Sequence, residues 1–284
     1  TAPDGVVLTV RQWTLPAQVT RRGAAFIIHG IGEHSGRYDH VAEALHAIGL
    51  DVRSYDQRGF GLSQGPQGRL PWPDALQDDA LLMYARYEAD LAAQGESTAP
   101  VLLAHSMGGA IAARIVTARS IRPRALVLSS PAFEPVLSPA ARGSLELFSG
   151  TAPNLPLRHH IQPEQLTHDP EIRKAITTDP LMHNQVSPRL VMGIITAGMG
   201  AMAMAPTLKV PTLLQVAGSD SVVKAERARE FAGRMPAGFS QLRWYDALFH
   251  EIYNESPADR ACVLGDLQAW LKSHVSPTET VAAG

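Results

Sequence analysis

The sequence has very little cysteine and no long apolar run. Cys262 is the one cysteine among 284 residues, so no disulfide can form within the chain, and a reducing, cytoplasmic compartment is expected. We expect the Cys262 thiol on the buried face of a helix, beside Leu264 and Leu267. Because no stretch of about eighteen apolar residues occurs and no hydrophobic leader opens the chain, we expect neither a spanning helix nor a signal peptide.

Basic clusters and metal-binding motifs are also missing. The formal net charge is -2 and the longest basic run is Arg21-Arg22, which argues against a nucleic-acid partner. The histidines form no H-E-x-x-H motif and have no cysteine partners, so no metal site is expected. The glycine-rich residues 56–65 do not satisfy G-x-G-x-x-G, which argues against a dinucleotide loop. No cofactor is therefore predicted.

Short apolar runs alternate with helical patterns through most of the chain. This alternation predicts an α/β fold with a mostly parallel central sheet and helices on both faces. Asp74 and Gln77 are spaced as a capping box at the start of a helix whose predicted buried face is Leu76, Ala80, Met83, Tyr87 and Leu91. In the last predicted helix, Val263, Leu267, Trp270 and Leu271 fall on one face. We expect strands at residues 6–15, 24–28, 50–55, 100–103, 125–129, 210–217 and 241–245.

Residues 134–205 interrupt this alternation. Frequent prolines divide the region into short pieces without a buried-strand pattern, which predicts an inserted helical cap, or lid. The α/β core then consists of residues 1–133 and 206–275. The small and polar residues 276–284 are predicted to be a disordered tail.

The end of the predicted cap is apolar and rich in methionine. Residues 190–204 hold four of the chain's eight methionines and no charged residue. Methionine is flexible and polarisable, so it suits a wall that accepts apolar ligands, and Leu190 and Ile194 are candidates for contact with such a ligand. The same pattern also fits a helix that packs on the sheet domain.

One strand-to-helix junction carries a candidate nucleophile. Ser106 lies between an apolar strand pattern and an alanine-rich helical pattern, in the string Ala104-His105-Ser106-Met107-Gly108. This arrangement indicates a nucleophile elbow, whose usual form is G-x-S-x-G. Ala104 replaces the first glycine and adds one methyl group, a departure that we expect the turn to tolerate.

Two further residues complete a candidate catalytic triad. Asp220 and His250 each follow a predicted strand, and with Ser106 they occur in the order nucleophile, acid, base. The carboxyl ends of parallel strands meet at one edge of a sheet, so the three side chains can converge there. His250 would take the proton of Ser106, and Asp220 would orient the imidazole. Asp246 is the weaker candidate for the acid because it shares a loop with His250.

A glycine-rich loop after the second strand supplies candidate oxyanion donors. Residues 29–36 lie where this architecture places a backbone N–H facing the nucleophile. We expect the N–H groups of Ile31 and Met107 to form the oxyanion hole. His29 is expected to order the loop by bonding its backbone, and His105 is expected to be structural.

Taken together, these motifs resemble the monoacylglycerol lipase and lysophospholipase branch of the α/β-hydrolases. The matching stretches are residues 29–38, which read HGIGEHSGRY, residues 56–63, which read DQRGFGLS, and residues 105–109, which read HSMGG. The resemblance implies a serine hydrolase that cleaves a single-chain lipid ester through an acyl-serine intermediate, without a cofactor. It also implies that Glu33 and Arg37 lie near the glycerol end of the substrate, with Arg37 bracing the loop.

Monoacylglycerol lipase activity is the expected function, and three alternatives stay open at this stage. A lysophospholipase or a general carboxylesterase would use the same triad. A lipid-binding protein without catalysis could use the same scaffold, because a fold alone does not establish a function. The apolar cap could also touch a membrane or micelle surface.

Overall fold

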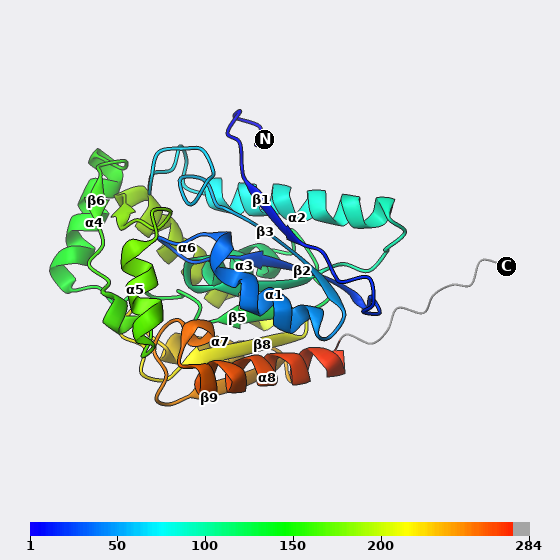
Figure 1. The fold of residues 1–284 in the computed structure, drawn as a ribbon. Helices are drawn as coiled ribbons and strands as arrows, with labels where there is room; N and C mark the ends of the chain where they lie inside the picture. Colours follow the sequence, from blue (N-terminus) through cyan, green and yellow to red (C-terminus); the bar gives the residue numbers. More distant parts are fainter. Residues whose placement is uncertain (275–284) are drawn as a thin grey trace.

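The computed structural model describes residues 1–274, which form a seven-stranded sheet with the strand order β1-β3-β2-β4-β5-β8-β9 (Figure 1). β1 pairs antiparallel with β3, and the other neighbours in this sheet are parallel, as predicted. The strands are β1 (Val10–Trp13), β2 (Gly23–Ile28), β3 (Leu50–Tyr55), β4 (Val101–His105), β5 (Leu126–Ser129), β8 (Thr212–Ala217) and β9 (Ser240–Tyr245).

Helices cover both faces of the sheet, and each face has its own apolar core. The core on one face includes side chains of α2, α3, α6 and α7, and the core on the other face includes side chains of α1 and α8. The helices are α1 (Asp39–His46), α2 (Ala75–Ala93), α3 (Ser106–Thr117), α4 (Pro139–Thr151), α5 (Pro170–Thr178), α6 (Pro188–Met204), α7 (Glu226–Arg234) and α8 (Pro257–His274). Single turns of 3-10 helix are η1 (Ser35–Tyr38), η2 (Pro163–Gln165), η3 (Ala205–Thr207) and η4 (Ile252–Asn254).

Burial explains why the central strands read as unbroken apolar runs. Every residue of β2, β4, β5 and β8 is buried, because helices pack on both faces of these strands. The edge strand β1 is shorter than the predicted strand at residues 6–15. Val7 and Thr9 accept backbone hydrogen bonds from Gln64 and Asp56 of a neighbouring loop, so the chain before Val10 pairs outside the sheet.

The start of α2 also differs in detail from the prediction. Its buried face is the predicted one, but the Asp74 carboxylate caps no backbone N–H and instead accepts a hydrogen bond from the Gln77 side chain at 2.9 Å. Asp74 has φ -96° and ψ 11°, outside the extended conformation that a capping residue usually adopts. The capping box is therefore not formed.

Between β5 and β8 the chain forms α4, α5, α6 and a two-stranded ribbon of β6 (Leu157–Arg158) and β7 (Gln185–Val186). α4 and α5 lie beyond one end of the sheet (Figure 1), whereas α6 packs extensively along α3. At Gly198 of α6, an added Cβ would lie 2.4 Å from the carbonyl oxygen of Phe133. The helix thus approaches the core backbone closely, and a single cap over residues 134–205 stays a prediction.

The 20-residue segment Pro188–Thr207 is long and apolar enough to cross a membrane by length and composition, with a mean hydropathy of 1.5 over an 18-residue window. This composition does not contradict the expectation of no spanning helix, because a buried core helix meets the same criteria. Leu190, Ile194 and Ala201 of α6 are buried in the core that α3 also contributes to. A helix that packs inside a fold can have the same composition, because its apolar side chains are buried against other apolar side chains instead of lipid.

The prediction for Cys262 was wrong. Val263, Leu267, Trp270 and Leu271 form the buried face of α8, as predicted, but the Cys262 thiol is exposed. In a helix successive residues differ by about 100° in direction, so the residue before Val263 faces solvent. The predicted disordered tail at residues 276–284 lies outside the described residues.

Candidate active site

Ser106 occupies a strained turn between β4 and α3. Its φ is 52°, a value that few residues other than glycine adopt, and its side chain is buried. At Gly108 an added Cβ would lie 2.5 Å from the carbonyl oxygens of Ile28 and His29, which explains why the residue two positions after Ser106 is glycine. Ala104, two residues before Ser106, is fully buried in β4, so its methyl group is accommodated.

The structure brings Ser106, His250 and Asp220 into one chain of hydrogen bonds. His250 Nε2 lies 2.8 Å from Ser106 Oγ, and His250 Nδ1 lies 2.6 Å from Asp220 Oδ2. The other carboxylate oxygen of Asp220 accepts from the N–H groups of Val222 and Val223 at 2.8 and 3.0 Å. Asp220 follows β8 and His250 follows β9, so the three residues meet at the carboxyl edge of the sheet.

Electrostatic interactions within this pair oppose the effects of burial on both pKa values. Burial alone would lower the pKa of His250, but the charge of Asp220 and its hydrogen bond raise this pKa above the ordinary 6.5. Burial alone would raise the pKa of Asp220, but His250 and the two N–H donors hold it below its usual value. Burial and the neighbouring His250 lower the pKa of His105 to about 4, so His105 stays neutral.

The loop after β2 presents backbone donors toward Ser106. Ile31 and Ser106 line the same cavity, and neither the Ile31 N–H nor the Met107 N–H has a hydrogen-bond acceptor within residues 1–274. His29 orders this loop, as expected, because its Nδ1 contacts Gly30 O at 2.8 Å and its Nε2 accepts from the Gln57 N–H at 2.9 Å. The arrangement can therefore bind an oxygen that becomes negatively charged.

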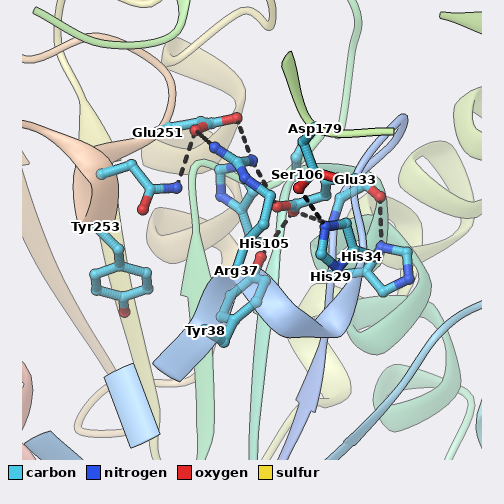
Figure 2. Close-up of polar contacts among 12 residues, drawn as sticks. His29, Glu33, His34, Arg37, Tyr38, His105, Ser106, Asp179, Glu251 and Tyr253 are labelled. Carbon is cyan, nitrogen blue, oxygen red and sulfur yellow. Dashed lines mark hydrogen bonds and ion pairs between the residues drawn. The ribbon is translucent and has the colours of Figure 1, made fainter. Parts of the chain in front are cut away.

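Figure 2 shows a buried ion network that supports this loop. Arg37 donates to Glu33 at 2.8 Å and forms a two-pronged contact with Glu251 at 2.9 and 2.7 Å. Glu33 in turn accepts from the Gly30 N–H at 2.5 Å and from the Tyr38 hydroxyl at 2.8 Å. Since Glu251 follows His250 directly, Arg37 connects the loop after β2 to the loop that carries His250.

Two cavities meet at Ser106. A cavity of about 300 Å³, the more polar of the two (the polar cavity), is lined by Glu33, Asn184 and four histidines together with apolar residues such as Leu166, Ile176 and Met182. A second cavity of about 490 Å³ is mostly apolar and runs between α4 and the core, past Leu145, Phe148 and Ile194. Both cavities share the residues Ile31, Ser106, His159, Ile161 and Val222.

These cavities test the placement of the predicted contact residues. Ile194 lines the apolar cavity and Glu33 lines the polar one. Leu190 and Arg37 line neither of these two cavities: Leu190 is fully buried in the core, and Arg37 is held between two glutamates. Sequence reasoning missed the α4 residues and His159, because their only signal was a cap of irregular pattern.

Comparisons with known proteins agree on one family. A family model described as serine aminopeptidase, S33, matches residues 20–257. A monoacylglycerol lipase of Mycolicibacterium smegmatis is 30% identical over 275 residues, which are 95% of this chain and 95% of that protein. An uncharacterised abhydrolase domain-containing protein of Dictyostelium discoideum is 26% identical over 276 residues, and the match covers 96% of this chain but only 28% of that longer protein.

A solved structure gives the same picture. The crystal structure of a monoacylglycerol lipase from Paleococcus ferrophilus superimposes with a TM-score of 0.83. It is 26% identical, and the match covers 94% of this chain and 99% of that one. The likeness therefore includes the region between β5 and β8 as well as the sheet domain.

Proposed function

Since the chain belongs to the serine aminopeptidase S33 family of α/β-hydrolases and is a serine ester hydrolase, we propose that its substrate is a monoacylglycerol, from which it releases a fatty acid and glycerol. The proposal rests on the monoacylglycerol lipase relatives and on one observation in this structure. That observation is the meeting of a polar and an apolar cavity at Ser106.

In the proposed mechanism, His250 takes the proton of Ser106 as the Ser106 oxygen attacks the ester carbonyl. The N–H groups of Ile31 and Met107 stabilise the oxyanion that develops. His250 then returns the proton to the leaving glycerol. In the second half of the reaction, His250 takes a proton from water as the water attacks the acyl-serine, and it returns this proton to Ser106 as the fatty acid leaves. Asp220 holds the imidazole tautomer and stabilises the imidazolium.

The two cavities fit the two halves of a monoacylglycerol. The apolar cavity of about 490 Å³ suits an acyl chain, and the polar cavity of about 300 Å³ suits glycerol. No lysine or arginine is among the described residues that line the polar cavity. Since a buried phosphate needs a cation, this supports a neutral alcohol over a lysophospholipid head group.

Glu33 and Glu251 are both paired with Arg37, which favours an ester substrate over a peptide with a free amino terminus. An aminopeptidase needs a carboxylate to bind the substrate's ammonium group. Glu33 and Glu251 are the carboxylates that line the polar cavity within the described chain, and Arg37 is bonded to both. We therefore propose that an amino-acid anilide is not a substrate.

A substrate panel tests the proposed function. We expect kcat/KM for a long-chain monoacylglycerol to exceed that for the lysophospholipid of the same acyl chain by about tenfold or more. Amino-acid p-nitroanilides should give no measurable rate. A clear preference for acetyl or butyryl esters, or for the lysophospholipid, would contradict the monoacylglycerol proposal and leave a general esterase or lysophospholipase.

The raised pKa of His250 gives a pH dependence. A general base must be neutral, so kcat/KM should fall as the pH drops through the pKa of His250, which lies above 6.5. In Asp220→Asn, burial lowers the pKa of His250 without the opposing charge of Asp220, so the acidic limb of the profile should move to lower pH. We expect kcat to fall about 10⁴-fold in this variant. Measuring kcat/KM from pH 5 to 9 for both proteins checks this, and an unmoved limb would argue against His250 as the base.

The proposal includes a mobile cap, formed within residues 134–205, that meets a lipid surface. Its support is the exposure of Val136, Leu147 and Leu155 around α4, at 50%, 62% and 37%. Val136 also lines the apolar cavity, and Leu147 belongs to α4, the helix whose Leu145 and Phe148 line it. A cytoplasmic location is likewise proposed, since a single cysteine suits a reducing compartment.

A further inference from the structure

His159 stands at the junction of the two cavities. It follows β6, and its N–H donates to the carbonyl oxygen of Asn184 at 2.9 Å, so the ribbon of β6 and β7 holds its backbone. Its side chain lines the polar cavity and the apolar cavity, which also share Ser106. A bound ester that reacts with Ser106 must therefore pass close to this imidazole.

The two ring nitrogens of His159 have different surroundings. Nδ1 accepts a hydrogen bond from the Ile161 N–H at 3.4 Å, so the neutral ring carries its hydrogen on Nε2. Nε2 is buried and has no hydrogen-bond partner among the described residues. It faces the oxyanion loop, since a Cβ added at Gly32 would lie 3.3 Å from it.

The neighbouring His183 differs from His159, because both of its ring nitrogens have hydrogen-bond partners. His183 Nε2 contacts the carbonyl oxygen of Gly59 at 2.8 Å, and Nδ1 accepts from the Gln185 N–H at 3.2 Å. Burial, followed by the proximity of His183, lowers the pKa of His159 to about 4, so its ring is neutral at pH 7. A buried donor without an acceptor is costly, so a ligand acceptor beside His159 Nε2 would be favourable.

We propose that His159 is a specificity-determining residue whose Nε2–H donates a hydrogen bond to an uncharged hydroxyl on the alcohol part of the ester. The inference rests on the proposed function and specifies its alcohol site. A neutral donor beside the oxyanion loop binds a hydroxyl without demanding a charge on the substrate. It thereby favours esters of glycerol over esters of alcohols that have no second hydroxyl.

The test compares two esters of one fatty acid, the glycerol monoester and the methyl ester. His159→Phe keeps the ring and removes its nitrogens, so kcat/KM for the glycerol ester should fall about tenfold, the effect of about one hydrogen bond. The rate for the methyl ester, measured on the same preparation, should change by less than about twofold. Equal losses for both esters, or no loss for either, would overturn the proposal.

Two amide variants sharpen the comparison. The amide of His159→Gln reaches the position of Nε2 and should recover most of the lost kcat/KM, whereas that of His159→Asn reaches only the position of Nδ1 and should not. Recovery in both variants, or in neither, would contradict a role for the Nε2–H. A misfolded variant is recognised because it loses the methyl ester activity as well.

A binding measurement separates this inference from the proposed function. A monoalkylglycerol ether, which cannot be hydrolysed, is titrated calorimetrically into Ser106→Ala and into Ser106→Ala combined with His159→Phe. We expect its Kd to rise about tenfold in the double variant. An unchanged Kd would refute the role of His159, whatever the wild type hydrolyses, and failure to hydrolyse monoacylglycerol would refute only the proposed function.

Discussion

Ser106→Ala is expected to lower kcat for every carboxylic ester by about a million-fold, the size of loss seen when a serine nucleophile is removed. The reason is that no other described hydroxyl is hydrogen-bonded to His250. Alanine removes a single oxygen and leaves the turn and the oxyanion donors in place. Initial rates on a p-nitrophenyl ester, together with labelling by a fluorophosphonate probe, measure the effect.

The matched control for this variant is Ser273→Ala in α8. The Ser273 hydroxyl donates to the carbonyl oxygen of Trp270 at 2.7 Å, on a helix that lines neither cavity at Ser106. Its kcat and its labelling should equal those of the wild type. Retention of more than about one thousandth of the wild-type kcat in Ser106→Ala would mean that another group is the nucleophile.

Arg37→Met is expected to lower the free energy of unfolding by about 3 to 5 kcal/mol at pH 7 and to reduce kcat strongly. The substitution leaves Glu33 and Glu251, both buried, without their cation. Burial raises the pKa of Glu251, while Arg37 brings it down to about 2, and the same balance lowers the pKa of Glu33. Glu33 also accepts a hydrogen bond from the Gly30 N–H, so a shift of the Glu33 carboxylate after loss of Arg37 would disturb the loop after β2.

The sign of the pH dependence identifies the cause. In the wild type, carboxylates with lowered pKa values stabilise the fold above their ordinary pKa of 4.5, and this stabilisation is lost as the pH falls through the lowered values. In Arg37→Met, burial alone raises both pKa values, so the fold favours protonated glutamates. The stability deficit should therefore shrink between pH 7 and pH 5, as urea unfolding would show.

Arg243→Met serves as the comparison for the arginine. Arg243 is 46% exposed and lies 3.9 Å from Asp266, so its removal should cost no more than about 1 kcal/mol. If Arg37→Met behaved like this surface variant and kept its kcat, the network would not hold the loop. A rise in KM with unchanged kcat would instead mean that Arg37 binds the substrate.

The elements that could be predicted from the sequence are those with a strong local pattern. The strand at residues 50–55 appears as β3 with the same limits, and the buried face of α8 was identified from helical spacing. Errors occurred where a single residue had to be placed. Cys262 lies next to a buried position but faces solvent, and Asp74 bonds a side chain instead of the backbone.

The candidate site divides in the same way. Ser106, Asp220 and His250 were located from their positions after strands, and the structure places them in hydrogen-bond contact. Arg37 was expected to brace the loop near the substrate, and its side chain lies in a buried ion network. Leu190 was a candidate for substrate contact, but its side chain lies in the core. Their partners are distant in sequence, and a local pattern holds no information about such contacts.

The sequence by itself determined the alternation of strands and helices, the strained serine turn and the order of the three candidate catalytic residues, because each depends on neighbouring residues and on period. Only the tertiary structure decided which side chains meet across the site. It joined Glu33 to Glu251 through Arg37 and packed α6 along α3. It also left His159 Nε2, at the junction of two cavities, without a partner among residues 1–274. These features arise from packing between segments that are distant in sequence. Arg37 and Glu251, for example, are 214 positions apart.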